Sequence, residues 1–398
     1  MNIPIVFAKI DLKAVEDNIV ALKKLTGPKV KFMAVVKADA YGHGAVKIVE
    51  TALKTGADCL GVARFNEAEK LRKAGVDAPI LIFGFIRSDL MEQLAELDLT
   101  ATIYSPEMAE QLSHQAREKG VIIKAHLKID TGMGRVGMLP DSRRPLPISK
   151  FCGSKNVSLI SNEKSIADIK RILSLPGIEL EGIYTHFAAA DSSDKSYARY
   201  QLEVFNLLLN DLKREKIEFQ ICHAANSAAI IDIPESHFDM VRAGIAIYGL
   251  YPSPEVNKTR AVLKPAMELK AVITSIKNVP KGFKVSYGMT YETQQETLIA
   301  SVPIGYADGF SRLLSSKGSM LVNGMRAPIA GRVCMDQTLI DVGHIPDVKT
   351  GDEVVIIGPQ FQNNGQKEII TADEIASLIG TINYEIVSSL TARVPKLY

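Results

Sequence analysis

The sequence has no excess of either charge and no long apolar run. Its 398 residues contain 47 Lys and Arg against 45 Asp and Glu, so it offers no basic surface for nucleic acid or an anionic membrane. No stretch approaches the roughly 18 consecutive apolar residues of a membrane helix. The apolar start of the chain is short, contains Pro4 and ends before Lys9, unlike an export signal. We therefore expect a small-molecule partner, and neither nucleic acid nor a membrane.

Cysteine is scarce and scattered. The four cysteines form no CxxC pair, so neither a disulfide framework nor a zinc site is indicated, and no metal is predicted. Such sparse thiols favour a reducing cytoplasm. With 46% hydrophobic and 23% charged residues, the chain has the composition of a folded globular protein, and its length predicts two domains.

The first 250 residues show a strand–helix rhythm. Amphipathic segments such as 106–119 and 200–213 separate short apolar runs of the kind that form buried parallel strands. The runs are Phe32–Val36, Cys59–Val62, Ile80–Phe83, Ile122–Ile129, Ile183–Tyr184, Phe219–Cys222 and Met240–Val241. No GxGxxG follows the first run, and seven or eight strands favour an eight-fold TIM-type α/β barrel, (β/α)8, over a doubly wound sheet, which stays the alternative.

The pattern changes after residue 251. The segments 266–279, 297–303, 319–330 and 352–358 are predicted to be strands joined by turns, which indicates a mainly β C-terminal domain. Residues 3–10 alternate like a strand that could pair with this domain. We predict a barrel over residues 11–252 and a second domain over 253–398 together with the strand in 1–10. Segment 139–164 is predicted to be a surface excursion.

Reactive groups of a barrel lie where strands end, and two such places carry unusual residues. Lys37 follows an apolar strand, where burial could lower its pKa and make it an amine nucleophile, although a lysine extended along the rim is the ordinary alternative. Arg135 follows the run Ile122–Ile129, in a turn that contains glycines. An arginine at that place could bind a carboxylate.

Other polar groups are ambiguous one by one. His186 and His223 follow strands but resemble ordinary core histidines. Ser227, after Asn226, and the pair Gly244–Ile245 each open a helical stretch and could bind phosphate, although Asn-Ser is also a common helix cap.

Taken together, the short patterns resemble those of one family. The string Ala34-Val-Val-Lys37-Ala-Asp-Ala-Tyr41-Gly-His-Gly-Ala45 is similar to the cofactor-lysine signature of alanine racemases. Further matches follow in the family's order: Lys128-Ile-Asp-Thr-Gly-Met-Gly-Arg135, Tyr184-Thr-His186-Phe, Asn226-Ser227, Arg242-Ala-Gly244-Ile245, Ser286-Tyr287-Gly288, Gly305-Tyr-Ala-Asp-Gly309, Val333-Cys-Met335-Asp336 and Arg393-Val-Pro. Many weak patterns in one order are far more specific than any one of them.

The resemblance implies a pyridoxal-5'-phosphate enzyme that interconverts L- and D-alanine for peptidoglycan, working as a head-to-tail homodimer with shared active sites. It implies Lys37 as the Schiff-base lysine and one base, with Tyr287 of the other subunit as the second. The remaining implied roles are cofactor binding by Tyr41, His186, Ser227, Arg242, Gly244, Ile245 and Tyr384, substrate carboxylate binding by Arg135 and Met335, and support from Lys128, His223 and Asp336.

Three of these residues carry finer expectations. Arg242 is expected to face the ring nitrogen of the cofactor, keep it unprotonated and so suppress transamination. Lys128 matches a position that is carbamylated in many family members. Tyr384, with Tyr291, resembles residues that narrow the side-chain pocket in favour of alanine.

Three alternatives stay open. A broad-specificity racemase, acting for example on serine, or a basic amino-acid decarboxylase would share the two-domain plan, although related decarboxylases place a carboxylate where Arg242 stands. A non-catalytic pyridoxal-phosphate carrier would need neither Tyr287 nor Arg135.

Overall fold

The computed structural model describes residues 4–141 and 162–398, which form two compact units. One unit comprises residues 14–38 and 45–264, and the other comprises the residues up to 13 together with 39–44 and 265–398. The limits predicted for the two domains stay a prediction. Most of the predicted excursion 139–164 lies outside the described residues.

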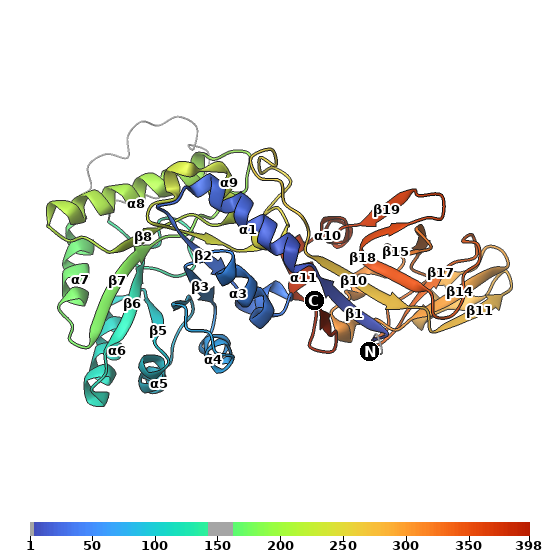
Figure 1. Ribbon diagram of the computed structural model, residues 1–398, viewed down its shortest axis with the longest axis horizontal. Coiled ribbons are helices and arrows are strands. Elements are labelled where there is room, and N and C mark those ends of the chain that lie inside the picture. Colours follow the sequence, from blue (N-terminus) through green and yellow to red (C-terminus); the bar gives the residue numbers. More distant parts are fainter. Residues whose placement is uncertain (1–3, 142–161) are drawn as a thin grey trace. The chain divides into compact units, whose positions relative to one another are not determined.

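The first unit is a closed barrel of eight parallel strands, which confirms the predicted fold class (Figure 1). Strand β9 pairs with β2 and so closes the sheet on itself. The strands are β2 (Lys31–Val35), β3 (Cys59–Val62), β4 (Ile80–Ile82), β5 (Leu99–Ile103), β6 (Ile123–Lys128), β7 (Ile178–Tyr184), β8 (Ile221–His223) and β9 (Met240–Ala243). All five residues of β5 are buried, as expected for a strand covered on both faces.

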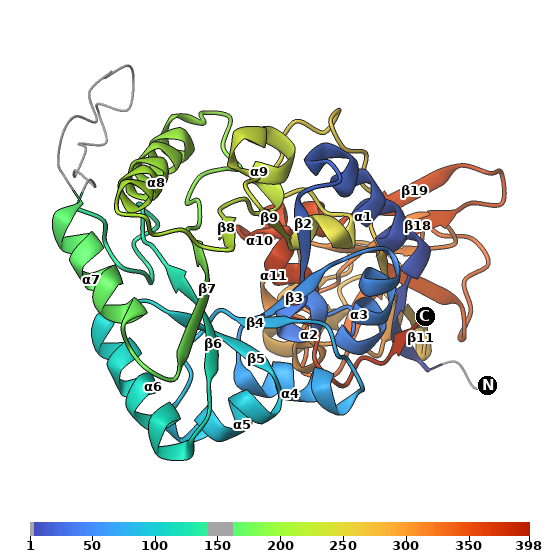
Figure 2. The same ribbon diagram turned by 60° about the vertical axis from the view of Figure 1, so that its left-hand side comes forward.

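Helices surround these strands (Figure 2). They are α1 (Leu12–Thr26), α3 (Ala45–Lys54), α4 (Phe65–Lys73), α5 (Met91–Glu96), α6 (Pro106–Lys119), α7 (Glu163–Leu173), α8 (Ser196–Arg214) and α9 (Ser227–Asp232). Helix α6 illustrates how the sequence sets the limits: the Ser105 hydroxyl caps the amide of Met108, Pro106 occupies the first turn, and Gly120 ends the helix in the left-handed region. No helix in the described ranges is long and apolar enough to span a membrane.

The second unit is mainly β. Its largest sheet has the order β16-β15-β18-β10-β1-β20, with β19 also paired to β18. These strands are β1 (Val6–Ile10), β10 (Met267–Val272), β15 (Ser319–Val322), β16 (Met325–Pro328), β18 (Glu353–Phe361), β19 (Lys367–Ile370) and β20 (Lys396–Leu397). The smaller sheets contain β11 (Ser275–Val279), β14 (Thr297–Val302) and β17 (Thr338–Asp341), and the pair β12 (Lys284–Val285) and β13 (Tyr291–Glu292). Two helices complete it, α10 (Ala372–Ile379) and α11 (Asn383–Ser388).

The segment after β2 has an unusual backbone. Helix α2 (Lys37–Tyr41) is a left-handed turn in which Ala38, Asp39, Ala40 and Tyr41 all have φ between 52° and 56°. Each non-glycine residue in this conformation costs about 1–2 kcal/mol relative to the right-handed form. Such a turn persists only where the surrounding structure holds it, and strain of this kind gathers at functional sites.

Candidate active site

Lys37 lies at the carboxyl end of β2, at the start of the left-handed turn. Burial lowers the pKa of its amine, and the Arg135 guanidinium lowers this pKa further, while Glu67 acts in the opposite direction. The Glu67 carboxylate itself is held by the backbone, because Oε1 accepts from the Ala38 amide at 2.6 Å and Oε2 from the Ala63 amide at 2.7 Å. Lys37 is therefore placed as an amine that loses its proton more readily than an ordinary lysine.

Arg242, on the neighbouring strand β9, is the centre of a buried hydrogen-bond network. Its Nη1 donates to Nδ1 of His223 at 2.8 Å, and its Nη2 lies 2.8 Å from Thr185 O, 2.9 Å from Ala224 O and 3.1 Å from Nδ1 of His186. Burial lowers the pKa of Arg242 to about 10, still well above neutral. The buried guanidinium is therefore charged and donates to four acceptors, while the Tyr184 ring centroid lies 5.3 Å from its Cζ.

This network determines the tautomers of two histidines. A guanidinium has only donors, so Nδ1 of His223 must be an acceptor and its proton must sit on Nε2. That Nε2 lies 2.9 Å from Nδ1 of His126, which is therefore an acceptor too. Burial and the charge of Arg242 lower the pKa of both rings, to about 4 in His126. The row Arg242–His223–His126 thus carries one positive charge, at its arginine end.

Lys128 and Tyr184 lie against the same network, at the ends of β6 and β7. The Tyr184 ring stacks on His223 with centroids 4.6 Å apart, and the Lys128 amine lies 5.6 Å from the Tyr184 centroid. Burial, Arg135 and Arg242 lower the pKa of Lys128 to about 8. A substantial share of this amine is therefore neutral in mildly alkaline solution.

Arg135 sits in a loop whose backbone is fixed from within. Oδ1 of Asp130 accepts from the amides of Gly132 and Gly134 at 2.9 and 3.0 Å, and Tyr197 donates to Gly132 O at 2.7 Å. The loop closes where Met138 N donates to Lys128 O. Arg135 itself is exposed, as a group that meets a ligand must be.

The candidate phosphate residues lie together after β8 and β9. Asn226 caps α9 by accepting from the Ala229 amide at 3.0 Å, and Ser227 Oγ accepts from the Gly244 amide at 2.8 Å. The chain then enters the short 3-10 helix Ile245–Tyr248, where Tyr248 donates to Val35 O at 2.9 Å beside the start of the Lys37 turn. The structure therefore brings Ser227, Gly244 and Ile245 together at one end of the barrel.

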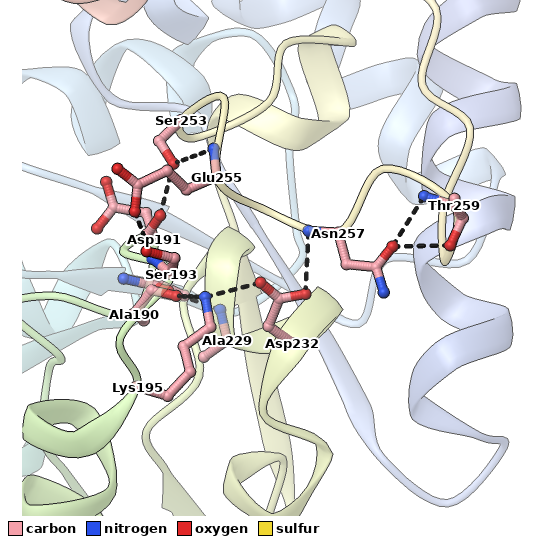
Figure 3. Close-up of polar contacts among 11 residues, drawn as sticks. Ala190, Asp191, Ser193, Lys195, Ala229, Asp232, Ser253, Glu255, Asn257 and Thr259 are labelled. Atoms are coloured by element: carbon pink, nitrogen blue, oxygen red, sulfur yellow. Dashed lines mark hydrogen bonds and ion pairs between the residues drawn. The ribbon is translucent and has the colours of Figure 1, made fainter.

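The segment after His186 is held by a buried ion pair (Figure 3). Lys195 Nζ lies 2.8 Å from Asp232 Oδ2 in α9 and donates to Ala190 O at 2.8 Å, with both charged side chains largely buried. Glu255 accepts from the Ser193 amide at 2.5 Å. Figure 3 shows these contacts connecting residues 190–195 to α9 and to the chain after β9. These contacts attach the loop that follows His186 to α9 and to the segment after β9.

The candidate residues Tyr287, Met335 and Asp336 belong to the second unit. Tyr287 begins the 3-10 helix Tyr287–Met289 after Ser286, which has φ of 64°, and its side chain is 71% exposed. Met335 is 53% exposed, and its carbonyl accepts from the Ala307 amide at 3.0 Å. Asp336 accepts from Arg393 at 2.7 Å. Tyr287 and Met335 are therefore two of the exposed large apolar side chains of this unit, and Tyr287 is the more exposed of the two.

Tyr384 lies in α11, and its ring centroid is 6.1 Å from that of Tyr41 in the left-handed turn. Burial raises the pKa of Tyr41, so its phenol is a neutral hydrogen-bond donor. Tyr291 is held by contacts within the second unit. Its hydroxyl donates to Asp341 at 2.8 Å, and its ring packs on the cluster that contains Val285 and Ile299.

Sequence reasoning missed the supporting residues Glu67, His126 and Tyr248. His126 could have been found, because it stands two residues before Lys128 in a strand and so faces the same side. Glu67 and Tyr248 carried no such signal, since their contacts join segments tens to hundreds of residues apart.

A closed parallel barrel with a lysine, an arginine and histidines at its strand ends, followed by a β-rich domain, defines a barrel enzyme with a second domain. Comparison with known proteins places it more closely. The model of the alanine racemase N-terminal domain matches residues 10–149 and 160–252, and that of the C-terminal domain matches 266–398. The chain belongs to the alanine racemase family.

Individual alanine racemases are similar to this chain over nearly its full length. The chain is 47% identical to an alanine racemase of Desulforamulus reducens, covering 99% of this chain and 98% of the relative, and 46% identical to one of Methanococcus maripaludis, covering 99% and 98%. Among solved structures, an alanine racemase of Clostridium difficile 630 matches with a TM-score of 0.89 and 38% identity, covering 100% and 96% of the two chains. One from Bacillus anthracis, with bound L-Ala-P, gives 0.88 and 37%, covering 100% and 95%. The predicted family, and an isomerase as the class of enzyme, are confirmed.

Proposed function

We propose that the protein interconverts L- and D-alanine with pyridoxal 5'-phosphate as cofactor. The observation that carries this proposal is the placement of Lys37 directly after β2 and of Arg242 on β9, the strand next to it. Lys37 is an amine with a lowered pKa, and the charged guanidinium of Arg242 donates to four acceptors. An arginine in this place disfavours the decarboxylase alternative, which calls for a carboxylate.

The residues present fit the cofactor. Lys37 offers an amine for its aldehyde, Arg242 a cation for its ring nitrogen, and His186 a flat neutral ring beside it. The hydroxyls of Tyr41, Ser227 and Tyr384 and the backbone amide of Ile245 are donors of the kind that phosphate binds, and the Gly244 amide, which donates to Ser227 Oγ, would exchange that partner for phosphate. When bound, the cofactor supplies an electron-accepting ring that makes the Cα–H bond of the amino acid acidic.

The side chains then have to move a proton from one face of Cα to the other. Two fixed bases on opposite faces achieve this, and we assign these roles to Lys37 and to Tyr287 of a second subunit. A lysine ordinarily has a pKa near 10, so Lys37 must be tuned toward neutrality to act as a base. Burial and Arg135 already lower the pKa of Lys37. The exposure of Tyr287 in the single chain supports a homodimer in which the other subunit covers it.

Arg135 and the backbone of Met335 are assigned to the substrate carboxylate. The exposed guanidinium of Arg135, on a loop fixed by Asp130, can bind a carboxylate through two hydrogen bonds without reorganising the loop. The charge of Arg135 lowers the pKa of Lys128, so a cationic Lys128 would repel Arg135, which favours a modified, anionic Lys128.

By analogy with the family, the product D-alanine would supply peptidoglycan, in the cytoplasm, where that precursor chemistry takes place. Catabolic use of D-alanine is the alternative role. Turnover of serine as a minor reaction stays a prediction, because one small group in a pocket discriminates by only about 1–3 kcal/mol.

The test is formation of D-alanine from L-alanine by the protein loaded with pyridoxal phosphate. Lys37→Ala should abolish it, and Tyr287→Phe should reduce it by orders of magnitude while cofactor binding persists. Tyr251→Phe is a matched control, because the Tyr251 hydroxyl donates to Ala261 O away from the site. Binding of cofactor without any D-alanine would overturn the proposal in favour of a carrier, and full activity of Tyr287→Phe would overturn the assignment of the second base.

A further inference from the structure

The left-handed turn between Lys37 and Gly44 has to be held in place, and the second unit contains the groups that hold it. Within the turn, the amides of His43 and Gly44 donate to the carbonyls of Ala40 and Asp39 at 3.0 and 2.9 Å, and Nδ1 of the buried His43 ring lies 3.1 and 2.9 Å from the carbonyls of Ala40 and Tyr41. Four consecutive non-glycine residues with positive φ cost about 1–2 kcal/mol each. Contacts from outside the turn add to its internal hydrogen bonds in offsetting this cost.

Strand β20, near the end of the chain, supplies one set of contacts. It lies parallel to β1, and Ala8 N donates to Pro395 O at 2.9 Å, so it is fixed to the edge of the largest sheet. Lys396 and Tyr398 are two residues apart in an extended chain, so their side chains leave the same side of it.

Both side chains reach the turn. Lys396 Nζ lies 3.7 Å from Asp39 Oδ2, and Tyr398 donates from its hydroxyl to His43 O at 3.3 Å. The approach is close enough that a Cβ at Gly44 would overlap with the Tyr398 hydroxyl. Lys396 therefore meets the start of the turn and Tyr398 meets its end.

Helix α11 supports the middle of the turn. A Cβ at Gly42 would overlap with the carbonyl of Val387, and Tyr384 of the same helix contacts Tyr41. The turn is thus supported at Asp39, Tyr41, Gly42 and His43, all by residues from the last sixteen positions of the sequence.

We propose that Lys396 and Tyr398 are positioning residues that clamp the left-handed turn and so fix Lys37 at its start and Tyr41 within it for cofactor binding. The clamp itself stands on the contacts above, and only its effect on the cofactor rests on the proposed function. Neither side chain needs to touch the cofactor, because each acts through the backbone between Asp39 and Gly44.

The test compares hydrogen exchange of the His43 and Gly44 amides in the unsubstituted protein and in the variants Lys396→Met and Tyr398→Phe, each measured with and without added pyridoxal phosphate. Removal of one partly exposed ion pair or one hydrogen bond should speed their exchange about threefold to tenfold. Lys270→Met is the matched control, since both lysine side chains are 14% exposed and Lys270 instead pairs with Glu268 and Glu353. Lys270→Met should leave these two amides unchanged.

A second substitution tests whether strain is what the clamp resists. Ala38 is exposed and has φ of 53°, a conformation that glycine adopts freely. Ala38→Gly should therefore restore slower exchange at His43 and Gly44 in the Lys396→Met background. A role of Lys396 in general stability would not be rescued at these two amides.

The rate of cofactor release then tests the link to function. Lys396→Met and Tyr398→Phe should lose bound pyridoxal phosphate several-fold faster than the unsubstituted protein, and Ala38→Gly should slow this loss again. Unchanged exchange in both variants would overturn the clamp, whatever the enzyme's activity. Faster exchange with unchanged cofactor release would overturn its role in positioning Lys37. Failure of the unsubstituted protein to bind the cofactor would refute the proposed function but leave the exchange result valid.

Discussion

Replacing Arg242 by glutamate tests how the charge at this position directs the reaction. The substitution exchanges a buried cation for an anion in a place where Thr185 O, Ala224 O, His186 and His223 all present acceptors. The carboxylate can donate to none of them. The pKa values of His186 and His223, which Arg242 now lowers, should rise in the variant because a negative neighbour favours the imidazolium form.

The cost in stability follows from the hydrogen bonds that the substitution removes. The carbonyls of Thr185 and Ala224 lose the donor that Arg242 provides. A buried acceptor without a partner costs about 1–3 kcal/mol, so the free energy of unfolding should fall by about 2–6 kcal/mol. Arg242→Lys is the control that keeps the charge but not the planar fork. It should cost less, because an ammonium can still donate to up to three of the same acceptors.

The assay is formation of pyruvate from alanine by the loaded variant. With a carboxylate at 242, the ring nitrogen of bound cofactor should hold a proton, and transamination should rise above that of the unsubstituted protein. Arg242→Lys should show no such rise. A folded, loaded Arg242→Glu variant that makes no more pyruvate than the unsubstituted protein would refute this account of Arg242.

Three further predictions concern other groups. Because the pKa of Lys128 falls to about 8, its neutral amine should add CO2, and 13C-bicarbonate should give a carbamate signal that Lys128→Ala lacks. Gly305→Ala would place a Cβ against the carbonyls of Cys334 and Met335 and so displace the Met335 backbone, which we assign to the substrate carboxylate. The KM for L-alanine should therefore rise about tenfold. An unchanged KM would contradict the role of Met335. Acid should destabilise the fold, because burial lowers the pKa of His43 and His126 to about 4, so that between pH 6.5 and pH 4 the unfolded chain binds these protons and the folded chain does not. Each of the two histidines should lower the free energy of unfolding by about 1.4 kcal/mol between pH 7.5 and 5.5. A denaturation midpoint independent of pH would contradict this.

The barrel was predictable because its strands are continuous apolar runs bounded by turn residues. One strand was missed: β5 reads Leu-Thr-Ala-Thr-Ile, and its two threonines hid a fully buried strand. The buried Thr102 hydroxyl is hydrogen-bonded: it donates to Ile82 O at 2.7 Å and lies 3.0 Å from the Tyr184 hydroxyl. The predicted run 266–279 is two strands, β10 and β11, that belong to different sheets.

The candidate site was predictable in its residues but not in its connections. Lys37 and Arg135 stood out by their places after strands, and the family resemblance named the others. Periodicity could not reveal that Arg242 fixes the tautomers of His223 and His126, since three strands must close a barrel before these side chains meet. The left-handed turn was equally hidden, because Ala38, Asp39 and Ala40 carry no local signal for positive φ.

The central claim is that two bases on opposite faces of Cα move its proton. Its most direct test incubates the loaded protein with L-alanine in deuterium oxide and follows chirality and deuterium at Cα together. The account predicts deuterated D-alanine, with the two enantiomers approaching equal amounts. Deuterium incorporation with the L configuration retained, or the absence of any exchange, would contradict it.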